Sequence, residues 1–192
     1  MSSGGADASL VTNSTIAHGA LMATSFVFLF PIGAIFVRFW SLRAHYLMQV
    51  INISVLVAGF GLGVFISKGA QLSSPHQIIG LVVFICIWMQ ALFGITHHLH
   101  YKHLRLLGVS HRYFGRAVIL LAIANGHLGI QLALQGLDVA WPVAVYWAVA
   151  GVMLILYAGL FIYAHVRDRK GKALDGDNEN ARARDKRGSP YA

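Results

Sequence analysis

The chain has 192 residues, of which 57% are hydrophobic and only 11% are charged, whereas about 25% charged residues are usual in soluble domains. Together with a mean hydropathy of +0.63, this composition excludes an ordinary soluble domain and predicts an integral membrane protein. The net charge of +8 does not indicate nucleic-acid binding, because the basic residues flank apolar runs, as at a membrane edge.

Charge-free apolar runs recur along the chain, and each is long enough for the roughly 20 residues that a spanning helix needs. Their hydrophobicity does not alternate, which favours helices over the strands of a membrane barrel. We therefore expect an all-α integral membrane protein. Its five transmembrane helices are expected near residues 15–39, 43–66, 75–99, 112–136 and 141–166.

The sequence predicts one membrane domain with two short flanking segments. Residues 15–167 form this domain, after an extracellular or lumenal N-terminal segment, residues 1–14. Residues 168–192 are basic, polar and poor in large apolar side chains, so a disordered cytoplasmic tail is expected. The chain has one cysteine and no CxxCH motif, so any haem would be held without thioether bonds.

The distribution of basic residues predicts the orientation. If the five helices alternate in direction, all of the 15 Lys and Arg residues except Lys68 fall on one side of the membrane. Basic residues in short loops are retained in the cytoplasm. We therefore expect a multi-pass protein with its N-terminus outside and its C-terminus in the cytoplasm.

Ten histidines are unexpected in such an apolar chain, because ionisable groups at membrane depth are costly and usually functional. His18, His45, His76 and His111 each lie near the start of one of the first four helices. Since the helices alternate in direction, His18 and His76 fall at the outer end, and His45 and His111 at the inner end. Two imidazoles on facing helices of a bundle can bind a haem iron between them.

Glycines follow these histidines at helical spacing. Gly80 and Gly115 lie four residues after His76 and His111, on the same helical face. They would let a porphyrin approach the backbone. Glycines near the far helix ends would offer a smooth patch to the other haem; they are Gly94, Gly129 and Gly59. The alternative reading is close helix packing, for which small residues are also used in membranes.

Four segments resemble the cytochrome b561 and ferric reductase transmembrane domain. They are AHG at 17–19, SPHQIIGLVV at 74–83, LFGITHHLH at 92–100 and HRYFGRAVILLAIANGHLGIQLAL at 111–134. The resemblance covers roughly residues 15–166. It is closest to the five-helix form that often follows an extracellular DOMON domain, which this sequence does not contain.

The resemblance implies that helices 1–4 form a four-helix bundle around two noncovalent b-type haems. Position by position, it implies that His18 pairs with His76 and His45 with His111, the same pairs as those derived from topology. It also implies transmembrane electron transfer from a cytoplasmic reductant such as ascorbate. Ferric chelate, the ascorbyl radical and a partner haem domain remain open as acceptors. A homodimer also remains open, as does an oxidoreductase activity of its own.

Basic residues near the inner haem could attract an anionic electron donor. The candidates for this weak substrate site are Lys102, Arg105 and Arg112. The alternative is that they only satisfy the positive-inside rule.

The remaining histidines have several candidate roles. His97 or His98 could contact a haem propionate or replace His45 as a ligand, and His127 is expected to contact another helix. The others are His100, His103 and His165. The competing function is a transition-metal transporter or sensor that uses histidines without haem. It would require acidic partners within the membrane, and the five expected helices contain no Asp or Glu.

Overall fold

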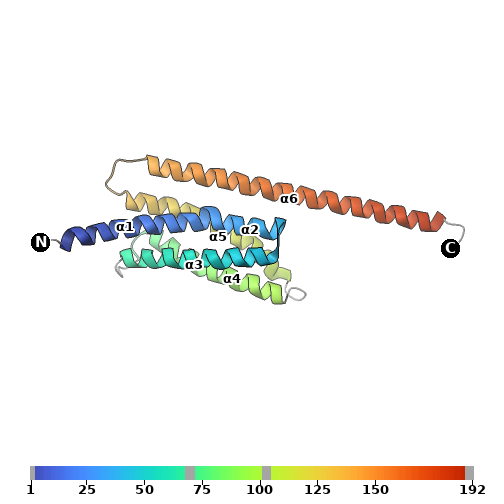
Figure 1. The fold of residues 1–192 in the computed structure, drawn as a ribbon, viewed down its shortest axis with the longest axis horizontal. Helices are drawn as coiled ribbons and strands as arrows, with labels where there is room; N and C mark the ends of the chain where they lie inside the picture. The colour runs from blue at the N-terminus through green and yellow to red at the C-terminus, as the bar shows by residue number, and fades with distance from the viewer. Residues whose placement is uncertain (1–2, 68–71, 101–104, 189–192) are drawn as a thin grey trace.

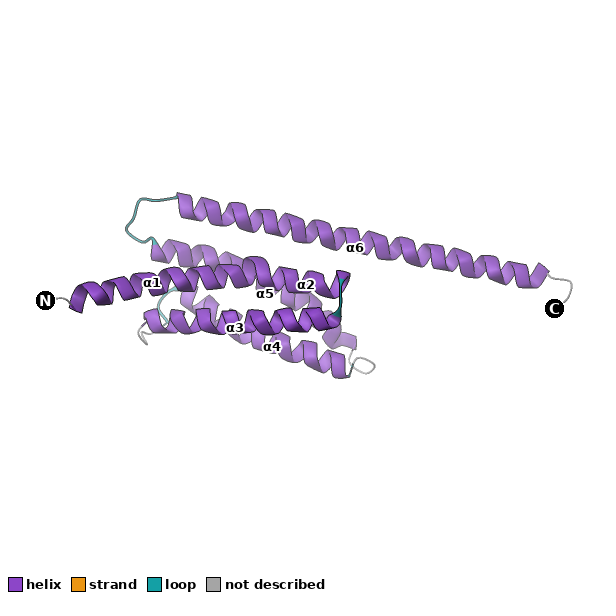
Figure 2. Cartoon of the chain, viewed as in Figure 1, coloured by secondary structure: helices purple, strands orange, loops and turns teal. Residues whose placement is uncertain are grey.

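The computed structural model describes residues 3–67, 72–100 and 105–188, and these are helical or in short connections, with no strand among them. Five helical spans within these residues are long and apolar enough to cross a membrane, which confirms the expected fold class. Figures 1 and 2 show the helices in chain order. They are α1 (Ser3–Ala23), the π-helical η1 (Thr24–Leu29), α2 (Phe30–Phe39), α3 (Leu42–Ser67), α4 (Pro75–Leu99), α5 (Arg105–Ala133) and α6 (Trp141–Gly188).

The start of α4 shows how the local sequence determines a helix end. Ser74 is the N-cap, and its side chain accepts a hydrogen bond from the main-chain N–H of Gln77. The Gln77 side chain in turn accepts from the N–H of Ser74, which completes a capping box. Pro75 occupies the first helical turn, where its missing N–H costs no hydrogen bond. This cap fixes where His76 enters the bundle.

The first span consists of α1, η1 and α2 in one continuous run. A π-helical turn is closed by hydrogen bonds five residues apart, so it holds one more residue than an α-helical turn. Its residues Ser25, Phe26 and Val27 are buried. The amphipathic pattern of the sequence predicts the span but does not predict this inserted residue.

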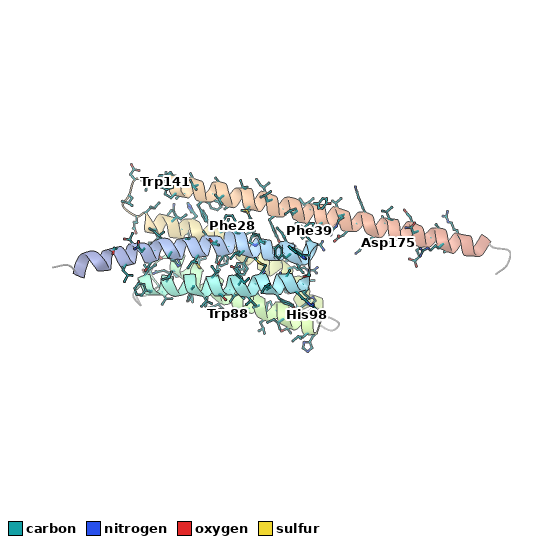
Figure 3. The ribbon with its side chains drawn as sticks, in the orientation of Figure 1. Phe28, Phe39, Trp88, His98, Trp141 and Asp175 are labelled. Atoms are coloured by element: carbon teal, nitrogen blue, oxygen red, sulfur yellow. The ribbon has the colours of Figure 1, made fainter. Side chains whose placement is uncertain are left out.

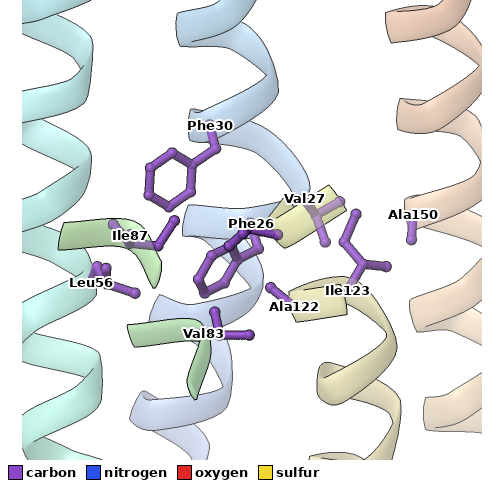
Figure 4. Packing of buried hydrophobic residues seen from close by; sticks show 10 residues of the cluster. Phe26, Val27, Phe30, Leu56, Val83, Ile87, Ala122, Ile123 and Ala150 are labelled. Carbon is purple, nitrogen blue, oxygen red and sulfur yellow. The ribbon is translucent and has the colours of Figure 1, made fainter. Parts of the chain in front are cut away.

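Four spans form the bundle, and the fifth lies on its outside (Figure 1). The first span packs against α3, and α4 packs against α5, while α6 contacts α2, η1 and α5. The buried cluster at the centre includes Phe26, Leu56, Val83 and Ile87 (Figure 4). Large apolar side chains also cover the outer surface, as with Ile155 at 73% exposure (Figure 3). A surface of this kind suits contact with lipid.

The helix α6 continues past the bundle to Gly188 (Figure 1). We expected residues 168–192 to be disordered, whereas the structure continues the helix through residue 188. The segment contains several Arg, Lys, Ala and Glu residues, which favour helix even where they bury little surface. An ion pair of 3.1 Å between Arg38 and Asp168 joins the start of this extension to α2.

Candidate functional site: two histidine pairs

Two pairs of histidine side chains meet within the bundle. The ring centres of His18 and His76 lie 6.0 Å apart, with their planes at 83°. Those of His45 and His111 lie 6.4 Å apart, with their planes at 89°. These are the two pairs expected from the sequence, and each joins a ring from the first span or α3 to a ring from α4 or α5. Their binding of haem iron stays a prediction.

Each of the four rings is held through Nδ1 by a main-chain carbonyl oxygen of a neighbouring helix. The bonds join His18 to Gly59 and His45 to Gly33 at 2.7 Å each, His76 to Asn125 at 3.0 Å, and His111 to Gln90 at 3.1 Å. A carbonyl oxygen can only accept, so in these bonds Nδ1 carries the proton and Nε2 keeps its lone pair. This is the usual arrangement of a metal-binding histidine, in which the second nitrogen orients the ring.

The four carbonyl groups occupy equivalent places along their helices. Gly59, Gln90 and Asn125 each lie 14 residues after the paired histidine of their own helix. Gly33 lies 15 residues after His18, because η1 takes up one extra residue. At a rise of 1.5 Å per residue, 14 residues separate the two levels by about 21 Å. Each antiparallel helix therefore holds its neighbour's histidine at the same spacing.

Glycines provide the space in which three of the rings lie. They are Gly129 beside His76, Gly63 beside His18 and Gly94 beside His111, where an added Cβ would stand 2.7, 2.8 and 3.0 Å from the ring Cε1, respectively. These separations are at or below the closest approach of real carbon atoms, so a larger residue would displace the imidazole. Glycine is therefore required by the close approach of the rings.

A repeat of 35 residues relates α4 to α5. In α4 the repeat consists of His76, Gly80, Gln90 and Gly94, and in α5 it consists of His111, Gly115, Asn125 and Gly129. The two copies interlock. A Cβ on Gly80 would lie 3.3 Å from Nδ2 of Asn125, and a Cβ on Gly115 would lie 3.3 Å from Oε1 of Gln90. The side-chain amides of one helix therefore lie over the glycines of the other.

The structure shows a second use for the glycines that the sequence selects. Gly94 and Gly129 lie against a histidine of the adjacent helix, and Gly59 lies against Met22, with 2.9 Å between an added Cβ and the sulfur. Contact of these glycines with a macrocycle stays a prediction. Sequence reasoning missed the roles of Gly33 and Gly63, although Gly63 lies 18 residues after His45, the spacing that selected Gly94 and Gly129.

The other histidines lie outside the two pairs. The His97 ring packs against Gly108 of α5, and its Nδ1 is buried without a hydrogen-bond partner. His98 lies edge-on to Tyr46, with 5.7 Å between ring centres. His127 accepts a hydrogen bond of 3.2 Å from the indole N–H of Trp147 on α6. His127 therefore contacts another helix, while His103 lies outside the described residues.

The structure describes the expected basic cluster only in part. Lys102 and the side chain of Arg105 lie outside the described residues. Arg112 donates a hydrogen bond of 3.1 Å to the carbonyl oxygen of Gly108 in its own helix. One turn further along, Arg116 lies over the Phe161 ring of α6 at 4.2 Å from its centre. Arg116 therefore helps to dock α6.

The geometry of the pairs fits the iron of a haem. An iron bound to one nitrogen of each ring at about 2.0–2.1 Å, the usual length of an imidazole–metal bond, would hold the ring centres roughly 6–6.5 Å apart. Both observed distances fall in this range. Among the described residues no group of three or more His, Cys, Asp or Glu side chains comes together. A haem needs only two axial protein ligands, whereas a bare transition metal usually needs three or four.

Comparison with known proteins gives two matches. Residues 6–100 match the model of a family described as a domain of unknown function, DUF2427. The chain is also 25% identical over 127 residues to a cytochrome b561 domain-containing protein of Arabidopsis thaliana, with 59% of this chain and 49% of that relative covered. The match thus spans about half the length of the relative. No solved structure matches the chain.

Proposed function

We propose that this protein conducts electrons across a membrane through two b-type haems. The observation that carries the proposal is the set of four imidazoles, each with Nδ1 bonded to a main-chain carbonyl oxygen and paired at a distance that suits an iron atom. The name of the distant plant relative supports the same function.

In this proposal the chain supplies the axial ligands, their orientation and an apolar surrounding. His18 and His76 would hold one haem, and His45 and His111 the other. When bound, haem supplies an iron centre that accepts and releases one electron at a time. The main-chain carbonyl oxygens keep Nε2 of each ring available, and the central apolar cluster excludes water between the two levels.

The direction of electron flow is part of the proposal. We propose a cytoplasmic reductant such as ascorbate at the end that carries Arg112, and an acceptor such as ferric chelate, ascorbyl radical or a partner haem domain at the other. Basic side chains near Arg112 would favour an anionic donor through long-range attraction. This feature is also what the positive-inside rule produces, so the haem content is the first property to test.

The test is the visible and electron paramagnetic resonance spectrum of the protein purified from haem-replete cells. We expect about two low-spin, noncovalent b haems per chain. His76→Leu should remove the haem of the His18–His76 pair alone, and His111→Leu that of the other pair, because the pairs lie at different levels. A colourless wild-type preparation, or the loss of the same component in both folded variants, would contradict the proposal.

A further inference from the structure

The side-chain amide of Gln90 lies against the His111 ring in the interior of the bundle. Gln90 is only 6% exposed. One atom of its amide group lies 2.8 Å from Nδ1 of His111 and 3.1 Å from the main-chain oxygen of His111, and the other lies 2.9 Å from the main-chain nitrogen of Gly115. The amide therefore contacts both the candidate ligand and the main chain of the helix that bears it.

The two orientations of this amide have opposite effects on the imidazole. With its nitrogen toward the ring, the amide donates to Nδ1 and to the main-chain oxygen of His111, while its oxygen accepts from Gly115. Nδ1 is then an acceptor, so the ring proton lies on Nε2. An imidazole in this tautomer has no free lone pair for iron, although all the contacts of the amide are satisfied.

With the amide oxygen toward the ring, Nδ1 carries the proton and Nε2 is free to bind a metal. The main-chain oxygen of Gln90, 3.1 Å away, and the side-chain oxygen then both face the Nδ1 proton. The reversed amide, however, brings its oxygen toward the carbonyl oxygen of His111 and its N–H groups toward the N–H of Gly115. The two orientations therefore satisfy different partners, and iron on Nε2 selects the second.

The other histidine pair lacks this feature. Asn125 occupies the place equivalent to Gln90, and its main-chain oxygen holds His76 at 3.0 Å. Its side chain is one methylene shorter, and its buried Oδ1 has no hydrogen-bond partner. His18 and His45 are held by Gly59 and Gly33, which have no side chain. Gln90 thus makes the His45–His111 pair different from the His18–His76 pair.

We propose that Gln90 is a positioning residue whose amide rotates when His111 binds iron, and that its oxygen then tunes this one site. The inference rests on the proposed haem function. A second acceptor on the Nδ1 proton makes the imidazole more basic, and a more basic axial ligand stabilises the oxidised iron. Gln90 therefore lowers the midpoint potential of the His45–His111 site and leaves the other site unaffected.

The test replaces Gln90 by methionine, which has nearly the same length and no amide. In the haem-loaded Gln90→Met protein, redox titration should show an upward shift of one midpoint potential and no change in the other. Variants His76→Leu and His111→Leu assign the two potentials to their pairs. Asn125→Leu is the matched control and should shift the potential of the His18–His76 site less. Unchanged potentials in Gln90→Met, or equal shifts at both sites, would overturn the inference.

A second measurement follows the tautomer in the full chain without haem. After ¹⁵N labelling of histidine, nitrogen chemical shifts distinguish a proton on Nδ1 from one on Nε2. We expect His111 to carry it on Nε2 in the wild type and on Nδ1 in Gln90→Met. An Nδ1 proton on His111 in the wild type would overturn the proposed rotation. A wild-type chain that binds no haem would instead contradict the proposed function, and the nitrogen shifts would still decide the tautomer.

Discussion

At the scale of single residues, the fit between glycine and imidazole is the most sensitive feature. A Cβ on Gly129 would stand 2.7 Å from Cε1 of His76, and that ring cannot move away without losing its bond to Asn125. Gly129→Leu should therefore lower the haem content of the His18–His76 site, at a cost of roughly 1–3 kcal/mol or more for overpacking. The measurement is haem per folded chain, with each site assigned by its potential.

Gly61 provides the control for this prediction, because an added Cβ there meets nothing within 4 Å. Gly61→Leu should keep both haems and the wild-type thermal stability within experimental error. If Gly61→Leu lost haem while Gly129→Leu retained it, the assignment of glycines to the rings would be wrong.

The single residues also show how far sequence reasoning reached. His18, His45, His76 and His111 were found because each lies near the start of an expected span, and helix direction alone then separates them into two pairs. The seat of each ring was missed. Nothing in a side-chain pattern marks the main-chain oxygen of Gln90 as an acceptor, since every residue has one and only the antiparallel register selects it.

At the scale of the elements, the sequence predicts the length and number of the helices but not their internal register. Apolar length locates the spans to within a few residues at most ends, because lipid imposes it. The π-helical turn η1 has no comparable signal. Its presence follows only from comparing His18 with Gly33, 15 residues apart, and His45 with Gly59, 14 residues apart, once both are known to lie at matching levels.

This register leads to a prediction about deletions. Removing Leu29 from η1 lets the turn relax to an α-helical turn, which leaves Gly33 on the face that holds His45. We therefore expect the Leu29 deletion to retain both haems with some loss of stability. Removing Val57, which is 43% exposed, from the regular helix α3 instead rotates the residues after it by about 100°.

The Val57 deletion should therefore move the oxygen of Gly59 away from His18 and lose the haem of that pair. Haem content and circular dichroism of both deletions in the same detergent provide the measurement. Equal losses in the two proteins would show that η1 does not act as a one-residue register correction.

At the scale of the whole molecule, hydrogen bonds and histidine pairs connect the helices in different ways. The carbonyl bonds of His18 and His45 lie within the unit formed by the first span and α3, and those of His76 and His111 lie between α4 and α5. The histidine pairs run across these two units. Each unit therefore carries one ligand for each candidate haem.

This division has a consequence for assembly, because a haem bound by one histidine from each unit would act as a staple between two preformed halves. If residues 1–71 and 72–192 are expressed as separate chains, we expect far more of the two to purify together from haem-replete membranes than from haem-depleted ones. Replacing both His18 and His45 by leucine should abolish the difference, since the first half would then have no paired ligand. Equal recovery with and without haem would mean that helix packing alone, including the contact of α6 with α2, joins the halves. The conduit would then be built before its cofactors arrive, whereas stapled halves would make cofactor supply the step that completes the fold.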